Sequence, residues 1–374
     1  MRSLGRSAVV RQEVIKLSAL IVLAVALFAA TWRVAASNHD TRLRDAAEWY
    51  RRGEQAIAAG RTDEAIDALR RATARDRDER RYGLAFAQAL TVKRDDDAAR
   101  AVLLTLRESS PEDAAVNLQL ARLAAARADL TEAPRYYHNA LYAPWPLEQA
   151  GARRQVRTEL VQFLLTHGQQ SRALAELLAL SADLPDEATP RLEAARLFTD
   201  AGDSAHALDQ CQRALHAAPE DQAAIACAGK AAFALGDYIL ADRYLRRLPV
   251  DSGEVLMRDV VGLVVSNDPL ASRIGAAERR RRLVDNVAYV RQRLVACEAT
   301  SSTRAPDVVS NLQDEARSFE QQLTRSRTLE QDTVERGLDL IDREERELAR
   351  SCGAQTARDQ ALTLIGRRHG AGGK

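Results

Sequence analysis

The longest uncharged stretch of the chain lies near its N-terminus. Residues 17–32 read LSALIVLAVALFAATW and contain no charged side chain. A helix rises about 1.5 Å per residue, so an extension to Ala36 reaches about 30 Å, the thickness of the hydrocarbon core of a bilayer. We therefore predict one transmembrane helix over residues 17–36, in which Arg33 reaches toward the headgroups and Trp32 lies at the interface.

The charges around this segment predict its orientation. The leader, residues 1–16, carries four basic residues and one acid, so the positive-inside rule places it in the cytoplasm and the body across the membrane. In a bacterial cell the protein would then lie in the inner membrane and face the periplasm. A cleaved signal peptide is the alternative, because Val34, Ala35 and Ala36 have the small side chains of a cleavage site.

Small and large apolar residues recur every 34 residues in the next part of the chain. After a linker at residues 37–45, six units are expected at 46–79, 80–113, 114–147, 154–187, 188–221 and 222–250. Position 20 is alanine in all six units (Ala65, Ala99, Ala133, Ala173, Ala207, Ala241), and position 8 is glycine or alanine in five (Gly53, Ala87, Ala121, Ala195, Gly229). Larger side chains at position 24 include Leu69, Leu103, Tyr137, Leu177 and Leu245. This pattern predicts two helices per unit that approach closely at positions 8 and 20.

Glycine and proline mark the ends of these helices. Gly60, Gly168, Gly202 and Gly236 stand at position 15, where a helix ends with a positive φ. Pro111, Pro185 and Pro219 stand at position 32, after the second helix.

These spacings resemble the tetratricopeptide repeat (TPR) family over residues 46–250, although Arg52 and Arg77 occupy positions where the family prefers Leu and Pro. The resemblance implies an all-α, right-handed α-solenoid of six helix-turn-helix repeats. It also implies that the first helices line a concave face that binds a peptide or protein partner and performs no catalysis.

The resemblance also indicates candidate partner-binding residues. In the family, positions 2, 5, 9 and 12 of the first helix point into the concave face. Position 9 is long and polar in every unit: Glu54, Gln88, Arg122, Gln162, Arg196 and Lys230. The three cations suggest a groove that accepts an acidic or carboxylate-ended segment. Alternatively, these positions are polar only because they face solvent.

The remaining chain predicts a small helical bundle at residues 251–353. An apolar helix at 253–266 is expected to cap the last repeat, and a second helix follows at 276–299. The apolar stripe of residues 307–352 changes phase at 324–330, which predicts two helices there. The basic run 279–282 is interpreted as a solvated turn, with contact to nucleic acid or anionic lipid as the alternative. Residues 354–374 are expected to be a tail.

The four cysteines suggest one structural bond. Cys297 and Cys352 each end a predicted helix at the same end of the bundle, so we expect a disulfide between them in an exported body. Cys211 and Cys227 flank the turn at Pro219 and could also meet. We favour a buried thiol there, because position 24 is a core position.

Composition limits the remaining functions. The net charge of +1 is unlike that of a dedicated nucleic-acid binder, and aromatic residues make up only 5% of an alanine-rich chain. No zinc-ligand spacing or catalytic motif occurs, so we expect no metal, cofactor or small-molecule substrate. The favoured function is a membrane-anchored module that recruits or organises envelope proteins. A self-assembling scaffold, or an enzyme with its site in the C-terminal bundle, are the alternatives.

Overall fold

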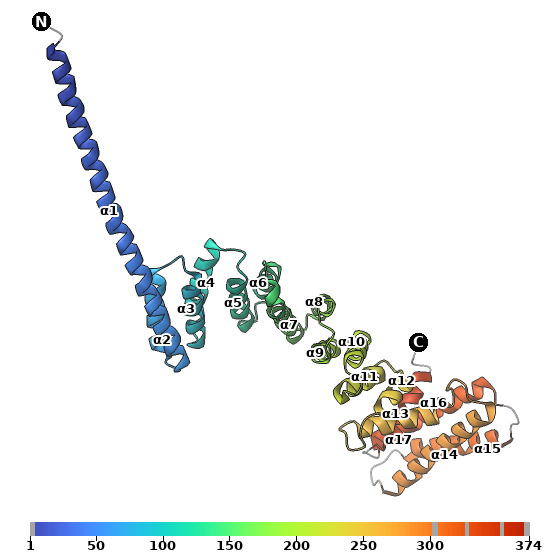
Figure 1. Ribbon diagram of the computed structural model, residues 1–374. Helices are drawn as coiled ribbons and strands as arrows, with labels where there is room; N and C mark the ends of the chain where they lie inside the picture. The colour runs from blue at the N-terminus through green and yellow to red at the C-terminus, as the bar shows by residue number, and fades with distance from the viewer. Residues whose placement is uncertain (1–3, 301–305, 326–328, 352–354, 370–374) are drawn as a thin grey trace. The chain divides into compact units, whose positions relative to one another are not determined.

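The computed structural model describes residues 4–300, 306–325, 329–351 and 355–369. These ranges contain seventeen α-helices and one 3-10 helix and no strand, which confirms the all-α prediction (Figure 1). The helices group into two compact units, Met1–Phe163 and Leu164–Lys374.

The first unit holds the first three repeats. Its helices are α1 (Leu4–Ala58), α2 (Thr62–Arg75), α3 (Arg80–Val92), α4 (Asp96–Ser109), α5 (Ala114–Ala126), α6 (Glu132–Tyr142), the 3-10 helix η1 (Leu147–Gln149) and most of α7 (Ala150–Thr166). From α1 to α6, each helix packs against the next one in the chain.

The second unit holds the later repeats and the bundle. Its helices are α8 (Gln170–Ala182), α9 (Ala188–Asp200), α10 (Ser204–Ala217), α11 (Gln222–Ala234), α12 (Tyr238–Leu245), α13 (Val255–Asn267), α14 (Ala276–Thr300), α15 (Pro306–Arg325), α16 (Gln331–Ser351) and α17 (Ala357–His369). From α8 to α13, each helix again packs against the next, whereas α16 packs against α14, α15 and α17.

The two helices of a repeat approach closely where the sequence places its small residues. A Cβ atom added to Gly53 would lie 2.6 Å from Leu69 Cγ, and one added to Gly229 would lie 2.6 Å from Leu245 Cδ2. In both cases the glycine is at position 8 and the leucine at position 24 of the same repeat. The alanines at position 20 are fully buried in all six repeats. The predicted contact between the helices is thus confirmed.

All six turns between the paired helices have the same left-handed residue. Gly60, Gly168, Gly202 and Gly236 have φ between 70° and 80°, and Arg94 (φ 66°) and Ala128 (φ 54°) occupy the same place in repeats 2 and 3. Glycine is usual at such a turn, because a side chain makes a positive φ costly. The sequence did not indicate the turns at Arg94 and Ala128, because neither residue is a glycine. Aspartate often follows: Asp95, Asp203 and Asp237 cap the next helix by accepting a backbone N–H bond.

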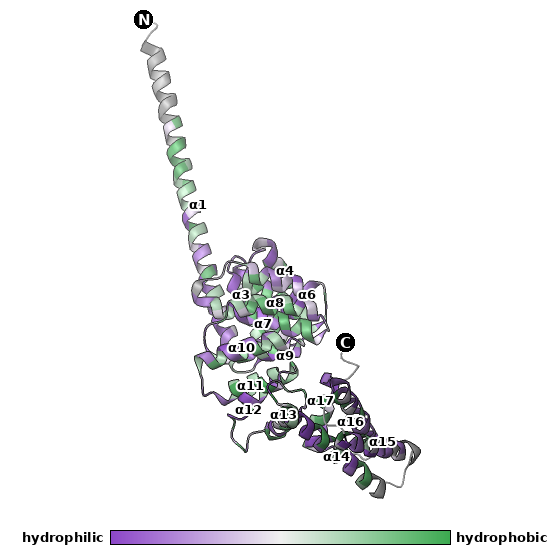
Figure 2. Ribbon diagram, turned by 90° about the vertical axis from the view of Figure 1, so that its right-hand side faces the viewer, coloured by the Kyte–Doolittle hydropathy of each residue, from purple (hydrophilic) through white to green (hydrophobic). Residues whose placement is uncertain are grey.

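Helix α1 is continuous from the apolar segment into the first repeat, so the expected linker at residues 37–45 is helical. No glycine or proline interrupts residues 17–52, and the hydroxyls of Thr31 and Thr41 donate to backbone carbonyls one turn earlier. From residue 20 onward the helix is long and apolar enough to cross a membrane, although a signal sequence would also meet these criteria. Its large apolar side chains between Leu17 and Val34 are 55–69% exposed. Figure 2 shows a stretch of the α1 ribbon in the green of hydrophobic residues.

Helix α13, which the sequence predicted as a cap on the last repeat, also packs against the bundle. Val260, Val261 and Val264 are buried, and α13 packs against both α12 and α17. One hydrophobic core runs from Ile225 of the last repeat to Ile365 of α17. The same core therefore continues across the domain boundary that was expected between residues 250 and 251.

The expected tail at residues 354–374 is also wrong, because α17 occupies most of it. Ala361, Leu362 and Ile365 are fully buried in the bundle. Thr356 and Asp359 form a reciprocal cap at its start: each backbone N–H donates to the other's side chain, at 2.8 and 3.2 Å. The short spacing of these two residues is the sequence signal that marks the start of α17.

The left-handed turns yield a matched prediction. Ala128→Gly should raise the free energy of unfolding by about 1 kcal/mol, because it relieves a side chain at positive φ. Gly202→Ala should lower it by a similar amount, since nothing lies within 4 Å of the added Cβ and only backbone strain changes. Urea unfolding of the full chain in detergent, followed by circular dichroism, measures both.

Gly253→Ala is the control, since Gly253 has no positive φ and its added Cβ also meets nothing within 4 Å. Shifts of the same sign for Ala128→Gly and Gly202→Ala would contradict the explanation.

Candidate partner-binding groove

The predicted candidate residues occupy equivalent places on the first helices of successive repeats. Gln88 lies on α3, Arg122 on α5, Gln162 on α7, Arg196 on α9 and Lys230 on α11, and all five are exposed. Within the second unit, Arg196 and Lys230 line the same pocket. The other three belong to the first unit.

This pocket, which we call the repeat 5–6 groove, has a volume of about 670 Å³. It is lined by α9, α11, the first residue of α10 and the segment that precedes α13. Its lining residues are Leu192, Arg196, Thr199, Ser204, Gln222, Ala223, Ala226, Cys227, Lys230, Ala231, Ala234, Leu248, Ser252, Gly253 and Glu254. Positions 5, 9 and 12 of repeat 5 and positions 2, 5 and 9 of repeat 6 are all among them. The lining thus follows the expected register of a repeat groove.

Most of the groove lining is apolar and small. Leu192, Leu248 and several alanines, including Ala223 and Ala226, leave room for a side chain from another molecule. Charged groups stand beside them at Arg196, Lys230 and Glu254. Such a mixture of apolar surface with a few polar groups is typical of a binding site.

Each cation of the predicted set has a carboxylate nearby. Lys230 Nζ lies 2.6 Å from Glu254 Oε1, and Arg196 Nη1 lies 3.6 Å from Asp200 Oδ2. These pairs reduce the net positive charge at the groove. The preference for an acidic segment therefore stays a prediction, and the apolar lining is the stronger feature of the site.

Arg122 forms the most complete of these pairs. Its Nε and Nη2 donate to the two carboxylate oxygens of Glu159 on α7, at 2.9 and 2.7 Å. The hydrogen bonds raise the pKa of Arg122. Burial, reinforced by the Glu159 charge, raises the pKa of the neighbouring Tyr137 to about 12. Arg122 thus links two successive repeats.

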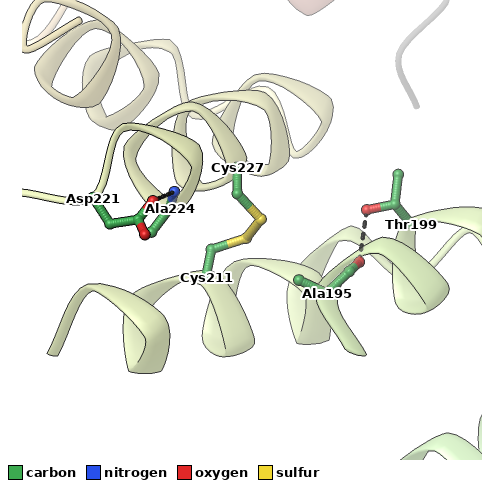
Figure 3. The surroundings of a disulfide bond; sticks show 6 residues. All are labelled: Ala195, Thr199, Cys211, Asp221, Ala224 and Cys227. Carbon is green, nitrogen blue, oxygen red and sulfur yellow. Dashed lines mark hydrogen bonds between the residues drawn. A yellow bond between two sulfur atoms is a disulfide. The ribbon is translucent and has the colours of Figure 1, made fainter. Parts of the chain in front are cut away.

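A disulfide joins Cys211 of α10 to Cys227 of α11, with the Cα atoms 5.7 Å apart (Figure 3). The preference for a buried thiol at this place was wrong. The reason is the register: position 24 of repeat 5 faces position 6 of repeat 6 across the interface between repeats. Closing a loop of this length contributes about 3 kcal/mol on the chain-entropy model. Cys227 also lines the groove, so the bond fixes one wall of it.

The disulfide expected between Cys297 and Cys352 involves a residue outside the described ranges. Cys297 belongs to the last part of α14, and Cys352 lies outside the described residues. The pairing of Cys297 with Cys352 stays a prediction.

The basic run 279–282 is part of the packing of the bundle. Arg279 donates to the carbonyl of Pro269, Arg280 to that of Leu323, and Arg282 to those of Val265 and Asp268. Arg281 and Arg282 both bond to Glu278 and lower its pKa to about 2. Three of the four arginines thus bind backbone oxygens near helix ends, which the interpretation as a solvated turn did not anticipate.

The hairpins, the six left-handed turns and the groove register all agree with one architecture. The chain has the tetratricopeptide-repeat fold. No known family profile matches the sequence, and no curated protein matches it. Among the described residues, no group of three or more His, Cys, Asp or Glu side chains could hold a metal ion.

Several solved TPR structures are similar to the chain. A thermophilic TPR protein of Thermus thermophilus is 23% identical, covers 51% of this chain and 98% of its own, and has a TM-score of 0.31. YrrB, described as a TPR protein with an unusual peptide-binding site, is 15% identical over 51% of this chain and 95% of its own (TM-score 0.36). The TPR domain of P58(IPK) is 15% identical over 87% of this chain and 98% of its own (TM-score 0.29).

Proposed function

We propose that this protein is a non-catalytic, membrane-anchored TPR protein that binds a protein partner through the repeat 5–6 groove. The observation that carries the proposal is the groove itself, because the residues that line it stand at the positions that a TPR uses for binding. Its apolar lining suits an apolar side chain of the partner, and Arg196, Lys230 and Glu254 suit polar contacts around that side chain.

We propose further that α1 is retained as an anchor and that the body is exported. The exposed apolar surface of α1 needs a nonaqueous environment, and a bilayer supplies one of matching length. The candidate cleavage residues Val34–Ala36 lie inside a continuous helix, where a protease would first have to unwind the backbone. From Ala36 to Ala46 the helix extends about 15 Å, which would hold the first repeat at that distance from the membrane.

Photo-crosslinking in the cells that produce the protein tests the groove. A photoreactive side chain at Ala226 should yield one predominant protein adduct. Ala223→Trp should then reduce its yield about tenfold, because the indole fills the groove and removes about 1.4 kcal/mol of binding free energy.

The controls use Ile239, an exposed residue of α12 that does not line the groove. A photoreactive group there should give no such adduct, and Ile239→Trp should leave the Ala226 adduct intact. An Ala226 adduct that consists of a second copy of this chain would instead favour the self-assembling scaffold. Equal adducts from both positions would refute binding at the groove.

Extraction of membranes with alkaline carbonate, followed by mass spectrometry of the intact protein, tests the anchor. The chain should remain in the pellet with residues 1–36 present. Changing Leu23 and Leu27 to Arg should release it, because each charge costs about 2.5–3.5 kcal/mol at the centre of a membrane helix. A soluble chain that begins after Ala36 would support the cleaved signal instead.

A further inference from the structure

The C-terminal bundle contains two glutamates in its hydrophobic core. Helix α16 packs against α14, α15 and α17, and Leu338, Ile341 and Leu348 form its buried stripe. Glu344 and Glu345 lie on the same stripe between Ile341 and Leu348, and their exposed fractions are 0% and 1%.

None of the four carboxylate oxygens of these glutamates has a hydrogen-bond partner. Buried polar groups are usually paired, and an unpaired buried carboxylate is costly when it is ionised. Both side chains project from the interior of α16 into the packed core.

The charged groups that face Glu344 are already paired with one another. Glu315 and Glu320 face it from α15 and Arg291 from α14, while Arg343 precedes it on α16. Arg291 bonds to Glu320 at 3.1 Å, and Arg343 bonds to Glu315 at 2.6 Å. These pairings leave no cation to neutralise an ionised Glu344.

Glu345 has similar surroundings on the side of α17. Asp359 faces it from α17 and Arg293 from α14, and Glu344 adjoins it on α16. Arg293 donates to Asp359 at 2.8 Å, and Tyr289 of α14 donates to the same carboxylate at 2.8 Å. An ionised Glu345 would therefore place a second negative charge beside the carboxylate that attaches the start of α17 to α14.

We propose that the α14–α17 bundle is a proton-controlled element, compact while Glu344 and Glu345 are protonated and loosened at α17 when they ionise. The proposal is independent of the groove and of the partner. In an exported body, the pH of the surroundings would act on it directly.

The direction of the pH dependence follows from the buried acids. Burial raises the pKa of Glu344 and the pKa of Glu345 from 4.5 to about 8. Between these values the folded state holds protons that the unfolded state has released. The stability of the bundle must then fall as the pH rises from about 4.5 to about 8. Above that range Glu344 and Glu345 are ionised in both states, so they cause little further change.

Hydrogen exchange of the full chain in detergent tests the proposal at pH 5.5, 7 and 8.5, with exchange times scaled to the intrinsic rates. Peptides from α16 and α17 should lose about tenfold or more of their protection across the series. Peptides from α9 and α11 serve as an internal reference and should change much less. A constant protection of α16 and α17 would overturn the proposal.

Glu344→Gln and Glu345→Gln, combined, should flatten this pH dependence, because glutamine does not titrate. Glu335→Gln is the matched control, since Glu335 is exposed on the same helix. A combined variant that keeps the wild-type pH dependence would overturn the proposal.

Infrared spectroscopy of the unmodified protein provides a readout that does not require the variants to fold. At pH 6.5 the proposal requires a carboxylic-acid band that disappears by pH 9.5. Its absence at pH 6.5 would show that both glutamates are ionised and would refute the proposal.

Discussion

The contact between a small residue at position 8 and a large one at position 24 determines how the paired helices fit together. Gly53 against Leu69 and Gly229 against Leu245 leave no space for even one added methyl group. Position 8 is glycine or alanine in five of the six repeats, and position 20 is a buried alanine in all six, so successive repeats pack their paired helices in a similar way. The groove lined by α9 and α11 lies between two such repeats. The disulfide between Cys211 and Cys227 then fixes two neighbouring repeats at the groove.

The repeats could be predicted because their signal is repeated six times, whereas features that occur once were harder to find. The turns at Arg94 and Ala128 have the left-handed conformation without the glycine that usually indicates it. Helix α17 is short, and only its cap between Thr356 and Asp359 marks its start. The disulfide depends on which residues face each other between repeats, and spacing along the chain does not determine this.

In the candidate site, too, the repeated features could be predicted and the features that occur once could not. The register placed Arg196 and Lys230 at one groove, but it could not indicate that Glu254, from the irregular segment before α13, would pair with Lys230. Charge along a sequence does not reveal which partner neutralises it. The arginines 279–282 illustrate this point as well, since three of them bind backbone carbonyls that lie far from them in the chain. Polar chemistry in this protein therefore depends on tertiary contacts, while the repeat architecture depends on local pattern.

A double-mutant cycle at Gly229 and Leu245 tests the packing claim most directly. Gly229→Ala alone should lower the free energy of unfolding by about 1–3 kcal/mol, because its Cβ overlaps the leucine. Leu245→Val alone should cost about 1 kcal/mol for the lost methylene. The account predicts that the double variant is more stable than the sum of the two losses, since the smaller side chain makes room for the methyl group. Strictly additive losses would contradict it, because they would mean that the two positions do not compete for the same space.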